Sequence, residues 1–323
     1  MWKTQRRLLV QWYHKTSQPG GCELGPRPID LHLAGLRRLG AELREEGGAL
    51  LCQAVSLKGC RIVLGLPSVG ATENLMLAAC GAAGVTHICN AAREPEIVDL
   101  QDFLNACGAA VTGAGTSTVT VEGGRTLHGC AYRVMPDRIV AATYLCAAAA
   151  AGGHIFLRGA REPHLDTVTA VLREAGCQIQ STAEGLDCRC AGRLHGVSRV
   201  RTAPYPGFPT DAQAVLMAAL LRSRGSTVFE ENIFENRYRH VDELTRMGAS
   251  VQVSGRVAVV TGREALHGAA VRCTDLRGGA ALCVAALAAD GMTEVSDISH
   301  IDRGYEDIVR DLKHLGGDIR RTE

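Results

Sequence analysis

The sequence has no apolar run long enough to cross a membrane, since its alanine-rich stretch at 147–151 is short and is followed by glycine. It also has no excess of basic residues: its net charge is +1, whereas nucleic-acid or membrane-surface binding usually requires a basic patch. We expect no signal sequence at the start of the chain, because no small-residue cleavage site follows the short apolar run after its basic start. We therefore expect a cytoplasmic protein with no nucleic-acid and no membrane partner, which leaves small-molecule chemistry open.

Two common motifs are missing as well. The thirteen cysteines include no Cys-x-x-Cys pair, and the closest two, Cys188 and Cys190, alternate as residues on one strand face do. This pattern favours reduced thiols in the cytosol. A Gly-rich dinucleotide loop after a hydrophobic strand is also absent, which argues against a doubly wound nucleotide-binding sheet. The sequence predicts no cofactor and no metal site.

A repeat of about seventy residues organises the chain. At 323 residues the chain is long enough for two domains, and five glycines recur along it at spacings of 68, 68, 72 and 68 residues, each four positions after a leucine. We predict that each glycine ends an exposed helix with a left-handed cap and that a strand begins about three residues later. The glycines are Gly40, Gly108, Gly176, Gly248 and Gly316, and the strand positions are Leu43, Val111, Ile179, Val251 and Ile319.

A second set of helical segments lies between these copies. They are rich in alanine and apolar on almost every side, which is typical of helices buried all round. Each ends at a glycine and leads into a short β-rich run. The predicted ranges are about 70–83, 138–151, 211–223 and 277–289. This alternation predicts sheets that face outward around a helical centre, whereas the first twenty residues resemble no part of the repeat.

The segment 20–31 combines a cysteine, three glycines and an arginine just before a predicted helix start. Glycine permits unusual backbone geometry, Pro28 suits a first helical turn, and the free N–H groups there favour an anion beside Arg27. Most other cysteines lie in apolar runs, but Cys22 has glycine, glutamate and proline neighbours. We interpret Cys22 as a reactive thiol that meets a phosphate or carboxylate; the alternative is a small buried apolar residue.

These motifs resemble those of the UDP-N-acetylglucosamine 1-carboxyvinyltransferases, a family of enolpyruvyl transferases, from residue 19 to the C-terminus. The matching segments are 19–22, 27–32, 68–72, 90–96, 201–204, 208–211, 234–237, 274–277 and 300–306. The resemblance implies an α/β fold (α+β repeats) of two inside-out α/β barrel domains, each built from three βαβαββ units. We accordingly expect a non-matching segment at 1–18, an incomplete first domain at 19–135 and a second domain at 136–323.

The resemblance implies transfer of the enolpyruvyl group from phosphoenolpyruvate to the 3′-hydroxyl of UDP-N-acetylglucosamine with release of phosphate, the first committed step of peptidoglycan synthesis. Cys22 is implied as the acid that protonates phosphoenolpyruvate and as the target of fosfomycin, and Asp211 as the carboxylate that approaches the sugar hydroxyl. Arg303 is implied as a further catalytic residue. The implied substrate-binding residues are Arg27, Pro28, Ile29, Asp30, Leu31, Ser68, Val69, Gly70, Ile233, Arg237, Asp275 and Arg277.

Two of these arginines occupy the same place in the repeat. Arg27 and Arg303 each precede a repeat glycine by thirteen residues, so we expect both at helix starts, facing one cleft. Two guanidinium forks suit the phosphate and the carboxylate of phosphoenolpyruvate. The alternative for each arginine is an ion pair on the solvated surface.

The chain departs from the family in two respects. About ninety N-terminal residues, more than one copy of the repeat, are expected to be missing, together with a Lys-Asn pair and an arginine that contact the substrates. Leu66 and Pro67 also replace a loop lysine. We therefore expect at most a trace of turnover from the chain as given. A non-catalytic UDP-sugar-binding remnant and a subunit completed by a separately encoded N-terminal segment stay open, and Cys22 argues against a shikimate-3-phosphate enolpyruvyl transferase.

Overall fold

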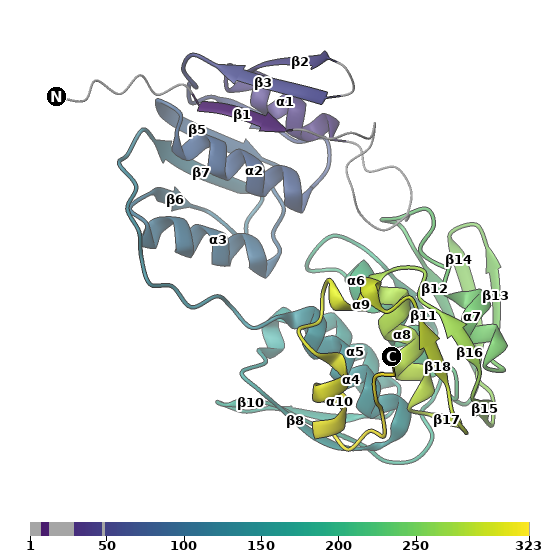
Figure 1. The fold of residues 1–323 in the computed structure, drawn as a ribbon. Coiled ribbons are helices and arrows are strands. Elements are labelled where there is room, and N and C mark those ends of the chain that lie inside the picture. Colours follow the sequence, from purple (N-terminus) through teal and green to yellow (C-terminus); the bar gives the residue numbers. More distant parts are fainter. Residues whose placement is uncertain (1–7, 13–28, 47–48, 323) are drawn as a thin grey trace. The chain divides into compact units, whose positions relative to one another are not determined.

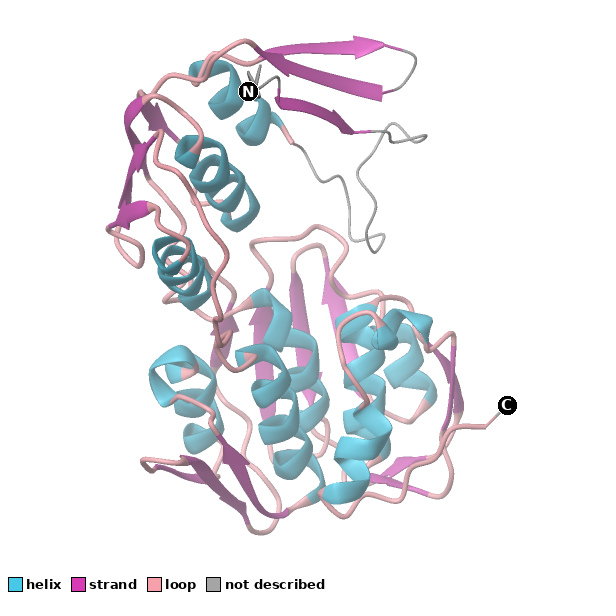
Figure 2. Ribbon diagram, turned by 60° about the vertical axis from the view of Figure 1, so that its left-hand side comes forward, coloured by secondary structure: helices cyan, strands magenta, loops and turns pink. Residues whose placement is uncertain are grey.

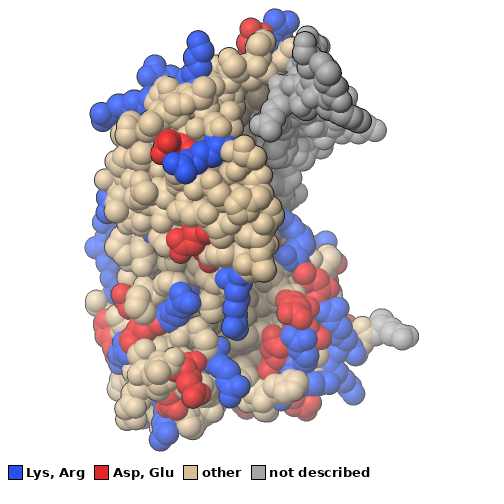
Figure 3. Space-filling model, turned by 90° about the vertical axis from the view of Figure 1, so that its left-hand side faces the viewer, with Lys and Arg blue, Asp and Glu red and all other residues tan. Residues whose placement is uncertain are grey.

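Helices and strands alternate along the computed structural model, which describes residues 8–12, 29–46 and 49–322 (Figure 1). These residues form two compact units that divide between Met135 and Pro136. Charged side chains of both signs are interspersed on the face of the second unit seen in Figure 3, while the face of the first unit there is mainly uncharged. None of the helices in the described ranges combines the length and the apolar character that crossing a membrane requires.

The first unit contains a complete βαβαββ run, as the resemblance implies. Its elements are β4 (Arg61–Val63), α2 (Val69–Cys80), β5 (Gly84–Cys89), α3 (Pro95–Ala106), β6 (Ala110–Thr112) and β7 (Thr118–Gly123). The strands form a sheet in the order β4-β5-β7-β6, in which only the β4–β5 pair is parallel. Leu75 and Met76 of α2 are fully buried in the core of this unit. This burial explains why the helix is so apolar.

A further sheet and helix precede this run. The elements are β1 (Leu8–Trp12), α1 (Asp30–Arg38), β2 (Glu42–Glu46) and β3 (Ala49–Ala54). The three strands pair antiparallel in the order β1-β3-β2, so residues that the sequence placed outside the repeat include a strand. Helix α1 packs on α2 at Gly35, where an added Cβ would lie 2.5 Å from Leu75 Cδ2. Glycine at this position therefore permits the close approach of the two helices.

Three helices form the centre of the second unit (Figure 2). They are α4 (Arg138–Ala151), α6 (Thr210–Leu220) and α8 (Leu276–Ala286), and each contacts the other two. Most of their residues are buried, so the predicted ranges for these helices and for α2 are confirmed to within a few residues. These helices are apolar on almost every side because each is surrounded by other parts of the protein.

Sheets and shorter helices surround this centre. The elements are β8 (Gly153–Arg158), η1 (Glu162–His164), α5 (Asp166–Glu174), β9 (Gln178–Ser181), β10 (Gly185–Cys190), β11 (Arg199–Arg201), β12 (Ser226–Glu230), α7 (Val241–Arg246), β13 (Ser250–Ser254), β14 (Val257–Thr261), β15 (Leu266–His267), β16 (Ala270–Arg272), β17 (Ala289–Asp290), β18 (Glu294–Ser296), α9 (Ser299–Asp302) and α10 (Ile308–His314). The sheets have the orders β8-β10-β9 and β11-β12-β14-β13, and two parallel pairs, β15-β17 and β16-β18, complete them. The run from β11 to β14 repeats the βαβαββ order of the first unit.

The five repeat glycines end helices as predicted. Their φ angles are 99°, 93°, 111°, 87° and 95° at Gly40, Gly108, Gly176, Gly248 and Gly316. This left-handed backbone is unfavourable for other residues, which explains the recurrence of glycine. Strands follow the first four glycines. The prediction of a strand at Ile319 is wrong, since residues 317–322 form no strand and no further strand follows there to pair with one.

Candidate active site

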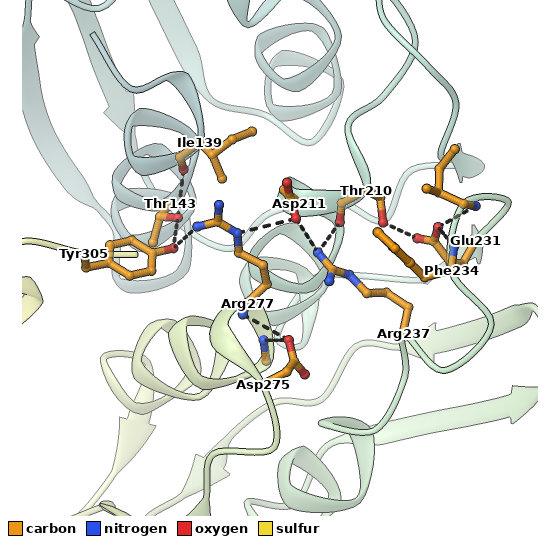
Figure 4. A network of polar contacts seen from close by, with 12 residues as sticks. Ile139, Thr143, Thr210, Asp211, Glu231, Phe234, Arg237, Asp275, Arg277 and Tyr305 are labelled. Carbon is orange, nitrogen blue, oxygen red and sulfur yellow. Dashed lines mark hydrogen bonds and ion pairs between the residues drawn. The ribbon is translucent and has the colours of Figure 1, made fainter. Parts of the chain in front are cut away.

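Asp211 lies in the first turn of α6, where free backbone N–H groups favour a carboxylate (Figure 4). Its side chain is 44% exposed, whereas that of Arg237 is 2% exposed. Arg237 Nη2 donates hydrogen bonds to Asp211 Oδ1 at 2.9 Å and to the Thr210 carbonyl oxygen at 3.0 Å. A buried guanidinium thus holds an accessible carboxylate.

A second arginine approaches the same carboxylate from α8. Arg277 Nε lies 3.5 Å from Asp211 Oδ1, and Arg277 Nη1 donates to the Tyr305 hydroxyl at 3.4 Å. That hydroxyl lies 2.8 Å from Thr143 Oγ1, which donates to the Ile139 carbonyl oxygen at 3.0 Å. Arg277 is therefore positioned by the carboxylate on one side and by a polar chain that reaches α4 on the other.

Asp275 sets the start of α8. Its Oδ1 accepts hydrogen bonds from the backbone N–H groups of Arg277 and Gly278, both at 3.0 Å, and its Oδ2 accepts from Thr274 Oγ1 at 3.2 Å. A carboxylate in this position satisfies donors that the helix itself leaves unpaired. Asp275 therefore holds the backbone of Arg277 in place.

Glu231 performs a similar task beside α6. Its Oε2 accepts a hydrogen bond from Thr210 Oγ1 at 3.0 Å, and its Oε1 accepts from the backbone N–H groups of Ile233 at 2.8 Å and Phe234 at 3.1 Å. The Arg237 guanidinium in turn lies 5.5 Å from the centre of the Phe234 ring. This buried acid fixes the loop that carries Ile233, whose side chain is exposed.

The two arginines control the charge of Asp211. Desolvation would by itself raise the pKa of Asp211, but the attraction of Arg277 and Arg237 outweighs it and holds the pKa below its usual value. The carboxylate is therefore ionised at neutral pH. A bound anion that drew the guanidinium groups away from Asp211 would raise its pKa and make it a better proton acceptor.

His240 packs behind this network, fully buried beside Asp275. A Cβ added to Gly278 would lie 2.9 Å from His240 Cβ and 2.6 Å from Asp275 Oδ2, so Gly278 packs closely against both residues. Burial lowers the pKa of His240 to about 4, although Asp275 opposes the shift.

Because the folded pKa of His240 is below its unfolded value, the unfolded chain binds an extra proton between about pH 6.5 and 4. The contribution of His240 to the free energy of unfolding should therefore be fully present above pH 6.5 and decrease as the pH drops. At pH 5 the loss from this group alone should be about 2 kcal/mol. Urea unfolding at pH 7.5 and at pH 5 measures this change in the free energy of unfolding. The variant His240→Gln should lose less stability over this range than the parent, while His314→Gln, at an exposed histidine, should behave like the parent. Equal losses in the parent and in His240→Gln would contradict the assignment.

In the first unit the predicted substrate-binding residues lie at two helix starts. Ser68 is the N-cap of α2, and its Oγ accepts a hydrogen bond from the Ala71 N–H at 3.4 Å. Val69 and Gly70 follow in the first turn, and a Cβ added to Gly70 would lie 3.3 Å from His32 Cε1. Glycine therefore lets the ring of His32 approach the start of α2.

Helix α1 starts at Asp30, with Ile29 as its N-cap. Asp30 stands in the first turn, where a carboxylate is favourable, and Leu31 lines a cavity of about 350 Å³ beside β4. Three other predicted site residues, Cys22, Arg27 and Pro28, lie outside the described residues.

Arg303 does not open a helix, which corrects the expectation from the repeat. It is the C-cap of α9, and α10 begins only at Ile308, with Asp307 as its N-cap. Gly304 packs tightly here, since an added Cβ would lie 2.6 Å from Leu276 Cδ2. The chain turns at this contact, so the exposed Arg303 precedes the turn instead of starting a helix.

Sequence reasoning did not assign roles to four residues of the network. Thr210 and Tyr305 lie inside matching motifs, and Glu231 lies three residues before the motif at 234–237, so position along the chain was a usable signal. Thr143 was marked by its polarity within the alanine-rich α4. Their partners could not be found from the sequence, because the contacts join segments as much as 162 residues apart.

Comparison with known proteins gives the family. The model of EPSP synthase (3-phosphoshikimate 1-carboxyvinyltransferase) matches residues 4–312. The chain belongs to the EPSP synthase family. It is 50% identical to UDP-N-acetylglucosamine 1-carboxyvinyltransferase 2 of Caldanaerobacter subterraneus subsp. tengcongensis, over 94% of this chain and 73% of that protein. It is 52% identical to the UDP-N-acetylglucosamine 1-carboxyvinyltransferase of Gluconobacter oxydans, over 95% of this chain and 74% of that protein.

Solved structures give the same fold. The enolpyruvyl transferase NikO from Streptomyces tendae superposes with a TM-score of 0.83 at 27% identity, covering 95% of this chain and 75% of that one. EPSP synthase from Acinetobacter baumannii has a TM-score of 0.67 at 21% identity, covering 90% and 71%, which shows a common fold. The resemblance to enolpyruvyl transferases read from the motifs is thereby confirmed.

Proposed function

We propose that the protein is a UDP-N-acetylglucosamine 1-carboxyvinyltransferase, which transfers the enolpyruvyl group of phosphoenolpyruvate to the 3′-hydroxyl of UDP-N-acetylglucosamine. The observation that carries the proposal is identity of 50% and 52% to two proteins of that name, over nearly the whole chain. The compared EPSP synthase is only 21% identical, which supports the UDP-sugar over shikimate 3-phosphate as acceptor. Both substrates are cytoplasmic metabolites, in agreement with the expected location and with a role in peptidoglycan synthesis.

Phosphoenolpyruvate offers a phosphate and a carboxylate, and the site offers guanidinium groups. Arg237 and Arg277 lie on either side of Asp211, at 2.9 and 3.5 Å from its Oδ1. Each can form paired hydrogen bonds with an anion, which gives direction as well as attraction. In our proposal Arg303 and Arg27 complete the anion site. No cofactor or metal is required by this chemistry.

Two proton movements accompany the transfer. The 3′-hydroxyl oxygen bonds to the central carbon of phosphoenolpyruvate while its proton passes to Asp211, and the Cys22 thiol gives a proton to the methylene carbon. The electrons of the carbon–carbon double bond form the new C–H bond, and a tetrahedral intermediate results. The Cys22 thiolate left by the first step then takes a proton from the methyl group and the double bond re-forms. The bond between the central carbon and the phosphate oxygen breaks, and the released phosphate takes the proton held by Asp211.

The low pKa of Asp211 decides when it can act. A carboxylate held by two arginines is a weak base in the empty site. It can accept the hydroxyl proton once phosphoenolpyruvate occupies the guanidinium groups and once bond formation makes that proton acidic. This order keeps Asp211 ionised and oriented until both substrates are bound.

We also infer that the two units correspond to the two barrel domains of the family. In the second unit each central helix is followed by outer helical structure, α4 by α5, α6 by α7, and α8 by the four-residue α9 and then α10, which supports three units in that domain. The first unit has one complete run and the elements before it, which supports an incomplete first domain. Ser68–Gly70 and Ile29–Leu31 would contribute UDP-sugar contacts from that domain.

Phosphate release with each substrate omitted in turn tests the function. We expect release only when phosphoenolpyruvate and UDP-N-acetylglucosamine are both present, and none with shikimate 3-phosphate as acceptor. Thermal unfolding with UDP-N-acetylglucosamine gives a second readout, because a ligand that binds the folded state raises Tm even without turnover. A rise in Tm with no phosphate release, also when a family-type N-terminal segment is supplied, would favour the non-catalytic sugar-binding alternative. Release with shikimate 3-phosphate would refute the acceptor assignment.

A further inference from the structure

Residues 124–135, here called the connecting strap, follow β7 and lead to the second unit without forming a helix or strand (Figure 1). The strap is held at its start by few backbone contacts: the Gly124 N–H donates to the Cys80 carbonyl oxygen at 3.0 Å, and the His128 N–H donates to the Cys107 carbonyl oxygen at 2.9 Å. No ladder of strand hydrogen bonds therefore fixes this part of the chain.

The later part of the strap lies along α3. The Tyr132 hydroxyl donates to Asp99 Oδ1 at 2.9 Å, the Met135 N–H donates to the same oxygen at 3.1 Å, and the Tyr132 ring meets Phe103 edge-on with a centroid separation of 5.5 Å. These contacts hold the strap against α3 after Cys130, and the His128 bond to Cys107 holds it before Cys130.

Two thiols meet between these anchor points. Cys107 Sγ, at the end of α3, lies 3.4 Å from Cys130 Sγ in the strap. Cys130 is exposed and Cys107 is half-buried, so a reagent in solution can reach the pair. A disulfide bond requires the two sulfurs to come within about 2 Å of each other, a movement of little more than 1 Å. The strap can make this movement because strand pairing does not hold it.

We propose that Cys107 and Cys130 form a reversible thiol modification site, in which a two-electron oxidant such as hydrogen peroxide converts the pair to a disulfide that fastens the connecting strap to α3. The exposed Cys130 sulfur attacks one peroxide oxygen, the O–O bond breaks, and water leaves with formation of a sulfenic acid. The Cys107 sulfur then attacks the Cys130 sulfur, the S–O bond breaks, and the thiol proton leaves with the hydroxide as a second water. The two thiols lose two electrons and two protons, and a dithiol reductant restores them.

The hydrogen bond between the thiols supports this order of events. It raises the pKa of Cys107, so Cys107 stays protonated while the more exposed Cys130 meets the oxidant. The pair is not part of any group of three or more possible metal ligands in the described part of the chain.

A second close pair gives an internal comparison. Cys188 and Cys190 Sγ atoms are 3.7 Å apart, nearly the separation seen in the strap, but both residues are buried in β10. They alternate along one strand, where Cys188 is paired with both β8 and β9 and Cys190 with β8, so backbone pairing holds them in place. Exposure and freedom of movement, and not sulfur separation alone, therefore distinguish Cys107 and Cys130.

Peroxide treatment of the native full-length chain, followed by tryptic digestion without reduction, tests the proposal. Cleavage at Arg93, Arg125 and Arg133 places Cys107 on 94–125 and Cys130 on 126–133, so their disulfide appears as one cross-linked peptide. We expect this peptide to form at least about tenfold faster in native protein than in urea, because the fold raises the effective concentration of the thiols. Dithiothreitol should remove it.

Cysteine-to-serine variants provide the controls. Cys107→Ser and Cys130→Ser should each abolish the cross-linked peptide, and Cys188→Ser should leave it unchanged. Oxidation should also raise Tm of the first unit by about 5 °C in the parent, since a loop of this length is closed, and not in the two strap variants. An equal rate in urea, or oxidation of the parent that joins other cysteines in preference, would overturn the proposal.

Discussion

Replacing Asp211 with asparagine should lower kcat of enolpyruvyl transfer by about 10²- to 10⁴-fold, the range expected for loss of a general base. Asparagine keeps the shape and an oxygen acceptor for Arg237 but cannot take the proton of the sugar hydroxyl. The guanidinium groups lose a negative partner, so the affinity for phosphoenolpyruvate should be unchanged or higher.

Phosphate release and phosphoenolpyruvate binding, measured on the variant and the parent in the same form of the protein, separate the two effects. Asp211→Glu keeps the charge and should retain more activity than Asp211→Asn. An asparagine variant that keeps its kcat, or one whose phosphoenolpyruvate affinity falls as far as its kcat, would show that Asp211 has another role.

The same pair of residues predicts an asymmetry in stability. Asp211→Ala should lower the free energy of unfolding by about 3 kcal/mol, because Arg237 is 2% exposed and would be left as a buried charge beside a single carbonyl. Arg237→Met should cost about 1 kcal/mol. It leaves a carboxylate that is 44% exposed and still close to Arg277, and methionine keeps apolar contact with Phe234.

Urea unfolding at pH 7 of the two single variants and of the combined variant measures this difference. The combined change removes both charges, so it should cost less than the two single changes added together. If Arg237→Met lost more unfolding free energy than Asp211→Ala, the exposed carboxylate, and not the buried guanidinium, would be the group that needs its ion-pair partner.

The helices could be predicted from the sequence because their causes are local. A glycine in the left-handed region ends α1, α3, α5, α7 and α10, and burial on every side gives α2, α4, α6 and α8 their uniform composition. Arg303 and Ile319 show the limit of the repeat. Both were placed by analogy with other copies, but one precedes a tight turn at Gly304 and the other has no strand to pair with.

The site could be predicted only in part. Asp211, Arg237 and Arg277 were named from motifs. The structure brings Asp211 and Arg277 together because the starts of α6 and α8 lie side by side, and Arg237 reaches Asp211 from the segment between β12 and α7 (Figure 4). The supporting contacts were not foreseeable. Nothing in the neighbours of Tyr305 indicates that its hydroxyl joins Arg277 to Thr143, since such a contact depends on how distant helices pack.

The Thr143 and Tyr305 hydroxyls are 162 positions apart in the chain, and the Tyr144 hydroxyl donates to Asp311 Oδ2 from a still greater distance along it. During translation, at about 5–20 residues per second, α4 leaves the ribosome many seconds before either partner has been made. For that time the apolar surface of α4 has only part of its final covering. Slow translation of the segment between α4 and Tyr305 would lengthen this interval, so the second unit should depend on chaperones while that segment is being made.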